Sequence, residues 1–178
     1  MRRSLDDAFL SLRQHVRDLA EGRARAVTTI FVYPADQEAA ALARFPVFAE
    51  ECAAGGRPVD LVDVAQGFRA ELERNEGRVD QLQTLERTAT QRVVSDLATF
   101  AEQFVSGELA RPVEPPTVCR LLVNTGALGT LISYSAITNG MPEAEGARVV
   151  IAFPGEDDQR SLNLLGLRTD MNYRVPRV

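Results

Sequence analysis

The alternation of hydrophobic and polar positions predicts helices and strands in turn along this chain of 178 residues. Apolar residues recur at helical spacing from Leu5 to Leu19, which predicts a first helix. Ser4 and Asp7 are placed to form a capping box before it, and Gly22 is placed to end it. Runs rich in β-branched and large apolar residues predict buried strands. These strands are expected at residues 26–33, 58–64, 117–124 and 148–154.

Capping residues and prolines divide the segments between these strands into helices. The longest helix carries an apolar stripe with a period near 3.6 residues, so we expect it to pack on its own domain rather than form a coiled coil. Three prolines in residues 107–116 predict a stiff surface connection. A polar turn is expected at residues 155–158 and a short edge strand at residues 172–178. Helices are expected at residues 37–44, 46–53, 65–74, about 78–105 and 125–139.

Alternating strands and helices predict the α/β class, as one domain over residues 1–178. The expected architecture is a mostly parallel open sheet of about four to five strands, with helices on both faces and one long helix before strand three. In such sheets, ligands bind beyond the carboxyl ends of the strands. The polar residues at these predicted ends are Asp36, Glu38, Asp63, Asn124, Thr125, Gly126, Glu156 and Asp157.

Composition excludes several kinds of chemistry. The formal net charge is −5, which argues against a protein that binds nucleic acid over its whole surface, although an arginine patch stays open. All 20 basic residues are arginine, so a P-loop lysine or a Schiff-base lysine cannot occur. His15 is the single histidine, so a site with several histidines cannot form.

The remaining composition indicates a cytoplasmic protein without a membrane anchor. The N-terminal segment has no apolar core of the kind that a signal peptide needs, and no apolar run approaches the length of a membrane span. Cys52 is expected on a helix and Cys119 in a buried strand. Both cysteines are expected to be apolar core residues in a reducing compartment.

No familiar catalytic motif is present, so we expect no catalytic residue, cofactor or metal. The segment NTGALGT, at residues 124–130, imitates a phosphate loop, but a tight strand-to-helix turn explains its glycines. Two alternatives stay open. One is a degenerate nucleotide- or metal-dependent enzyme that binds magnesium through the carboxylates at the strand ends, Asp36, Asp63, Glu156 and Asp157. The other is an accessory protein that binds nucleic acid through an arginine patch.

The last third of the chain resembles a known family. A TGAL turn follows a strand at Thr125 and Gly126, a Phe-Pro-Gly turn follows the next strand at residues 153–155, and an NYR segment lies at residues 172–174. This combination resembles the BrxB-domain family of bacteriophage-exclusion (BREX) defence systems. The resemblance covers most of the chain, and its specific motifs come after residue 117. Gly129-Thr130 after the TGAL turn, and a single tyrosine after the asparagine, depart from the family pattern.

The resemblance implies a non-catalytic adaptor in an antiviral complex that confers phage resistance. The implied partners are a PglZ-type alkaline-phosphatase-like protein, a large ATPase and a DNA methyltransferase, with DNA reached only indirectly and no membrane. Self-association is left open. Thr125 and Gly126 are expected to form a structural turn. The residues expected to contact a partner, or to pin the segment that does, are Phe153, Pro154, Gly155, Asn172, Tyr173 and Arg174.

Overall fold

The structure is a computed structural model that describes residues 4–25, 28–75, 77, 80–82, 89–134, 137, 148–157, 161–164, 168–171 and 178. Its elements, in chain order, are α1 (Leu5–Ala20), β1 (Thr29–Tyr33), η1 (Ala35–Gln37), α2 (Glu38–Ala54), β2 (Val59–Asp63), α3 (Val64–Arg74), α5 (Thr90–Ala110), β3 (Cys119–Val123), η2 (Thr125–Leu128), β4 (Val149–Asp157), β5 (Ser161–Leu164) and β6 (Arg168–Met171).

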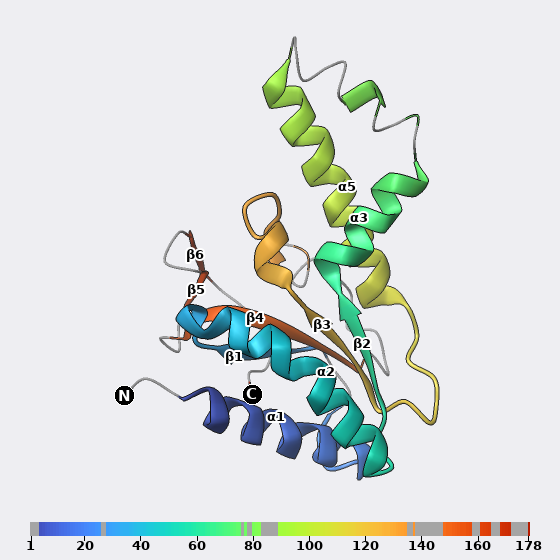
Figure 1. The fold of residues 1–178 in the computed structure, drawn as a ribbon, viewed down its shortest axis with the longest axis vertical. Helices are drawn as coiled ribbons and strands as arrows, with labels where there is room; N and C mark the ends of the chain where they lie inside the picture. Colours follow the sequence, from blue (N-terminus) through green and yellow to red (C-terminus); the bar gives the residue numbers. More distant parts are fainter. Residues whose placement is uncertain are drawn as a thin grey trace.

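Four parallel strands form the centre of the fold, in the order β2-β3-β4-β1 (Figure 1). The chain crosses from β1 at one edge to β2 at the other, and then returns strand by strand to β4. The end of β4 pairs antiparallel with β5, and β5 pairs antiparallel with β6. The predicted α/β class, with a mostly parallel sheet and helices on both faces, is confirmed.

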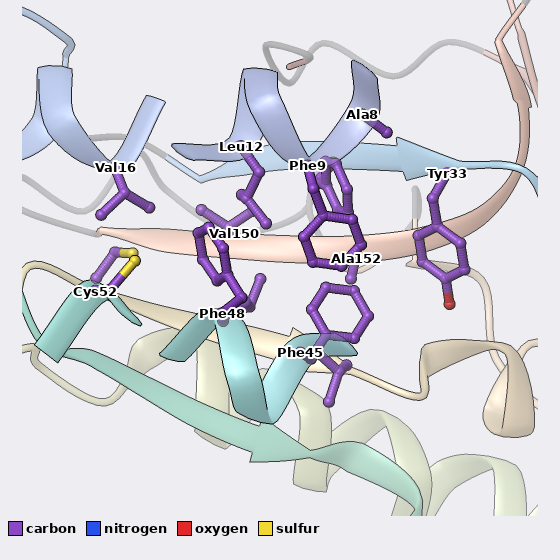
Figure 2. Close-up of a cluster of buried hydrophobic side chains, with 14 of the residues drawn as sticks. Ala8, Phe9, Leu12, Val16, Tyr33, Phe45, Phe48, Cys52, Val150 and Ala152 are labelled. Atoms are coloured by element: carbon purple, nitrogen blue, oxygen red, sulfur yellow. The ribbon is translucent and has the colours of Figure 1, made fainter. Parts of the chain in front are cut away.

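Helices α1 and α2 cover one face of the sheet. The ring of Phe9 on α1 is central to this layer, because its centroid lies 5.6 Å from that of Phe31 in β1. It also lies 5.1 Å from the centroid of Phe45 and 5.8 Å from that of Phe48, both on α2 (Figure 2). The predicted capping of α1 is confirmed: the Ser4 side chain accepts the first-turn N–H, and Gly22 follows the helix at φ +69°.

Helices α3 and α5 cover the other face. Leu122 of β3 and Ile151 of β4 point into this second cluster, where they meet Phe68 of α3. A Cβ atom at Gly67 of α3 would lie 2.8 Å from the end of the Phe104 ring on α5. The absence of a side chain at this position therefore lets the two helices approach closely.

Both cysteines lie in the first cluster and neither forms a disulfide. As predicted, Cys52 is on a helix and Cys119 is in a buried strand. Burial raises the pKa of both thiols, and it raises that of Cys119 to about 12. Each thiol is therefore protonated at neutral pH and acts as a small apolar side chain.

Helix α2 is continuous, so the predicted division into two short helices at Pro46 is wrong. Proline inside a helix removes the hydrogen bond to the carbonyl four residues earlier, here that of Leu42. Phe45 and Phe48 lie on either side of the proline and are both buried against α1. This packing on both sides of Pro46 explains why the helix continues despite the missing bond.

The chain after β3 forms a short 3₁₀ turn, so the start at Thr125 of the helix predicted over residues 125–139 is wrong. Asn124 takes the left-handed conformation, with φ of 58°. The Thr125 hydroxyl donates a hydrogen bond to the Ala152 carbonyl of β4. Because that hydroxyl binds the neighbouring strand, it does not cap a helix of its own.

The long helix before the third strand is confirmed, although its bounds differ from the predicted 78–105. Helix α5 begins at Thr90 and ends at Ala110, while residues 83–88 lie outside the described part of the chain. Its last turn includes residues 107–110, which belong to the stiff connection predicted at 107–116. The connection between α5 and β3 is correspondingly shorter.

Strand β4 is longer than predicted. It continues through residues 155–157, where a polar turn was expected, and these residues pair with β5. Gly155 lies opposite Leu164 in this antiparallel ladder. The leucine-rich segment after β4 thus contributes a strand that its sequence did not predict.

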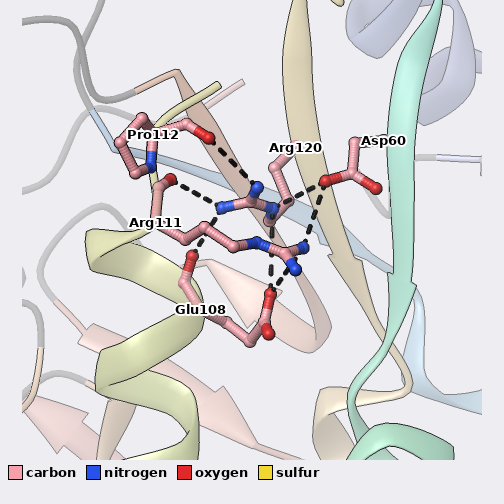
Figure 3. A network of polar contacts seen from close by, with 5 residues as sticks. All are labelled: Asp60, Glu108, Arg111, Pro112 and Arg120. Carbon is pink, nitrogen blue, oxygen red and sulfur yellow. Dashed lines mark hydrogen bonds and ion pairs between the residues drawn. The ribbon is translucent and has the colours of Figure 1, made fainter. Parts of the chain in front are cut away.

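The buried guanidinium of Arg120 anchors the amino end of the sheet (Figure 3). Arg120 lies in β3 with its side chain only 4% exposed, and its Nε donates to Asp60 of β2 at 2.8 Å. The same guanidinium donates to the carbonyls of Glu108, Arg111 and Pro112 at 2.7–3.3 Å. Because these carbonyls end α5 and follow it, one side chain fixes the helix to two strands.

The charges around this guanidinium are balanced locally. The Glu108 carboxylate lies 3.0 Å from Arg111 and 3.8 Å from Arg120, and Arg111 also pairs with Asp60 at 3.3 Å. Carbonyls at a helix C-terminus carry a partial negative charge and lack partners within the helix. The Arg120 guanidinium brings both a positive charge and several hydrogen-bond donors to these carbonyls.

We predict that Arg120→Leu lowers the free energy of unfolding by about 3 kcal/mol, because it removes the closer of the two arginine partners of Asp60 and leaves the carbonyls at the end of α5 without their side-chain donor. Arg120→Lys should cost less, since it keeps the charge but not the planar set of donors. Urea unfolding monitored by circular dichroism measures both. Arg69→Leu is the control, because Arg69 pairs only at the exposed surface of α3. Equal losses for Arg120→Leu and Arg69→Leu would contradict the anchoring role.

Candidate functional site at the carboxyl edge of the sheet

The carboxyl ends of the four parallel strands meet at one edge of the sheet, which is where a ligand would bind in this class of fold. The strand register places Asp63 beside Val123 and Tyr33 beside Pro154. The edge is therefore lined by the last residues of β2, β3 and β1 and by Pro154, the last residue of β4 that pairs with β1.

The Asp63 carboxylate is held by two donors from its own chain. Its Oδ1 accepts the backbone N–H of Gln66 at 2.9 Å and thereby caps α3. The Asn124 side chain donates to the same carboxylate at 3.1 and 3.3 Å. Asp63 thus joins the end of β2 to the turn after β3.

The turn at Thr125 and Gly126 is closed by neighbouring side chains. The Tyr134 hydroxyl donates to the Thr125 carbonyl at 3.0 Å, and both residues are buried. A Cβ atom at Gly126 would lie 2.8 Å from Oε1 of Glu38 and 3.1 Å from Cγ of Pro154. Gly126 therefore lies close to α2 and β4, and a larger side chain at this position would displace the end of the Glu38 side chain and press on Pro154.

At this edge the Glu38 carboxylate acts electrostatically on the buried Tyr33 hydroxyl, which the sequence did not predict. Tyr33 is 1% exposed, and its hydroxyl has no hydrogen-bond partner among the residues that the structure describes (Figure 2). Burial, and then the nearby Glu38 charge, raise the pKa of the phenol. Burial also raises the pKa of the Glu38 carboxyl. The only sequence signal was their position, directly before and after the turn that follows β1.

Two of the four carboxylates proposed for a metal site, those of Asp36 and Asp63, are not brought together. Asp36 follows β1 and Asp63 ends β2, which are opposite edges of the parallel sheet. Three strand spacings separate these edges by roughly 14 Å. Within the described ranges, no group of three or more metal-ligating side chains occurs. Glu156 and Asp157 lie in the part of β4 that pairs with β5, and the arrangement of their side chains is outside the described structure.

The first group of expected contact residues lies in the interior. Phe153 is 1% exposed, and Pro154 and Gly155 are also buried in β4. Pro154 pairs with Tyr33 of β1, whereas Gly155 already pairs with β5. These residues are therefore placed to pin the C-terminal segment rather than to meet a partner directly.

The second group of expected contact residues, Asn172, Tyr173 and Arg174, lies outside the described residues. Beyond it, the N–H of Val178 donates to the Ile30 carbonyl of β1 at 3.0 Å. Val178 also packs against the cluster under α1 and α2. The second group thus lies in the chain between the end of β6 and Val178, which binds β1.

Comparison with known proteins gives no match: no protein-family model fits the chain, and no curated protein or solved structure is significantly similar to it. Across the described part of the chain, no helix has the length and apolar character needed to cross a bilayer.

We predict that Glu38→Gln stabilises the protein at neutral pH, because it removes the cost of a partly buried negative charge. The folded pKa of Glu38 lies above its ordinary 4.5, so the wild type loses stability as pH rises through the folded pKa. The two unfolding curves should therefore coincide near pH 4 and separate toward pH 7. Thermal unfolding across this range measures the difference.

Glu50→Gln, at an exposed position on the same helix, controls for the loss of one negative charge. A Glu38→Gln variant that is less stable than the wild type at pH 7 would contradict this account of the site. A gain in stability at pH 4 as large as the gain at pH 7 would also contradict it.

Proposed function

We propose that this protein is a non-catalytic adaptor subunit of a bacterial anti-phage defence complex of the BREX type. In this proposal it acts in the cytoplasm and binds a PglZ-type alkaline-phosphatase-like protein. The proposal rests on the resemblance of the C-terminal third to the BrxB-domain family. One structural observation favours it over a ligand-binding enzyme.

That observation is the internal use of the polar groups at the carboxyl edge. The Asp63 carboxylate caps α3 and binds Asn124, while the Thr125 hydroxyl binds β4. Glu38 and Pro154 close the space next to Gly126. Groups that would hold a phosphate or a magnesium ion are thus engaged in fixing turns, which suits a scaffold better than an active site.

The C-terminal segment 153–174 supplies the contact surface in this proposal. Its first three residues are buried and fixed in β4, after which the antiparallel strands β5 and β6 continue from the parallel sheet (Figure 1). Val178 binds β1 beyond its other end. The segment therefore lies between two attachments to the parallel sheet.

We predict that Tyr173→Ala combined with Arg174→Ala reduces co-purification with a co-expressed PglZ-type protein at least tenfold, because interfaces draw much of their affinity from tyrosine and arginine. Pull-down with quantitative mass spectrometry measures the recovery. Arg69→Ala combined with Arg74→Ala is the matched control, since both arginines form exposed pairs on α3.

Unchanged recovery with intact folding would remove segment 153–174 as the contact. Failure of the wild-type chain to retain any PglZ-type protein would remove the adaptor function itself. Calorimetry with magnesium and ATP addresses the enzyme alternative, because heat of binding that disappears in Asp63→Asn would favour that alternative instead.

A further inference from the structure

Helices α1 and α2 run parallel and side by side on the same face of the sheet (Figure 1). Two ion pairs join them across their outer surface: Asp6 pairs with Arg44 at 2.5 Å, and Arg13 pairs with Glu51. The pairs are seven residues apart on each helix, which corresponds to about 10 Å along the axes. They therefore mark the two ends of one surface patch.

Two large apolar side chains are exposed between these pairs. Leu10 on α1 is 67% exposed and Val47 on α2 is 52% exposed. Leu10 is four residues after Asp6 and three before Arg13, so the three residues share one side of α1. On α2, Val47 is three residues after Arg44 and four before Glu51, so these three residues also share one side of their helix. We name this patch the α1/α2 face, and its residues are Asp6, Leu10, Arg13, Arg44, Val47 and Glu51.

The α1/α2 face concentrates exposed apolar surface. Only one further large apolar side chain in the described residues is comparably exposed, Val94 on α5 at 49%. Next to Val47, the exposed side chains of Ala40 and Ala43 are small. Another helix can therefore approach α2 closely at this point.

We propose that the α1/α2 face binds a second copy of the same chain and forms a two-fold symmetric dimer. The four charges carry alternating signs around the apolar centre: Asp6 is negative, Arg44 positive, Glu51 negative and Arg13 positive. A two-fold axis that lies in the interface and runs across the helices places Asp6 opposite Arg13 of the other copy. It also places Arg44 opposite Glu51.

The second symmetric arrangement gives the same complementarity. A two-fold axis in the interface that runs along the helices places Asp6 opposite Arg44 and Arg13 opposite Glu51 of the other copy. Every charge thus meets an opposite charge in both arrangements, while Leu10 and Val47 become covered. A partner surface of one sign would meet two like charges, so this pattern fits a second copy better than an acidic or basic partner.

The inference does not depend on the proposed adaptor function, because it concerns the isolated chain. We expect the full chain to show a monomer–dimer equilibrium in sedimentation velocity between about 1 and 100 µM. Leu10→Gln combined with Val47→Gln should weaken dimerisation about 100-fold or more, since both apolar side chains are buried in both copies. Val94→Gln, on the opposite side of the sheet, should leave dimerisation unchanged.

A wild-type chain that stays monomeric throughout this range overturns the proposal. A dimer that is unaffected by the Leu10 and Val47 substitutions overturns the assignment of its surface. Circular dichroism and melting temperature verify that each variant is folded, which is expected because the substituted side chains are exposed.

Reversal of all four charges gives a second and independent test. The variant Asp6→Arg, Arg13→Glu, Arg44→Glu and Glu51→Arg keeps both ion pairs within the chain and restores the alternating pattern with opposite signs. It should dimerise with itself but not with the wild type, since each charge would then face a like charge. Native mass spectrometry of the mixture should show an excess of homodimers, and free mixing of the two chains would overturn the proposal.

Discussion

The arrangement of the helices and strands depends on the hydrogen bonds and ion pair of the buried Arg120 guanidinium. A buried charge is costly unless opposite charge and hydrogen bonds surround it, so its partners are fixed together. Those partners come from β2, from the last turn of α5 and from the connection that follows it. Apolar attraction is non-directional, whereas five donors in one plane specify a single position for the end of α5.

This anchor at the amino end of the sheet leaves the carboxyl end to be closed by different means. There the chain uses a carboxylate cap at Asp63, a left-handed residue at Asn124 and a glycine at Gly126 that admits two neighbouring side chains. The result is an edge in which polar groups mainly bind one another. Tyr33 differs, because its buried hydroxyl has no such partner in the described structure, and burial together with the Glu38 charge raises the pKa of its phenol.

Local patterns in the sequence were sufficient for the four parallel strands, the first helix and its caps. They failed where a distant contact overrides the local preference. Pro46 predicted a helix break, but aromatic packing on α1 keeps α2 continuous. Thr125 predicted a helix cap, but its hydroxyl binds a strand 27 residues further on.

The same limit applies to the anchor and the candidate site. Arg120 lies in the apolar run CRLLV, and its partner Asp60 is 60 residues away, so nothing local indicates a buried ion pair. The strand-end acids appeared able to converge because the sequence does not give the strand order. Once β1 and β2 are placed at opposite edges, Asp36 and Asp63 are too far apart to bind one metal ion.

The two proposed surfaces are compatible because they use different parts of the fold. The α1/α2 face lies on the outer side of two helices, whereas segment 153–174 continues from the end of β4. A two-fold dimer would carry two copies of that segment in a fixed relation. When two linked contacts engage a partner that is itself paired, the second contact forms at a high effective concentration, so weak individual contacts give firm attachment. Self-association would thus give a small adaptor avidity, because two linked contacts replace one.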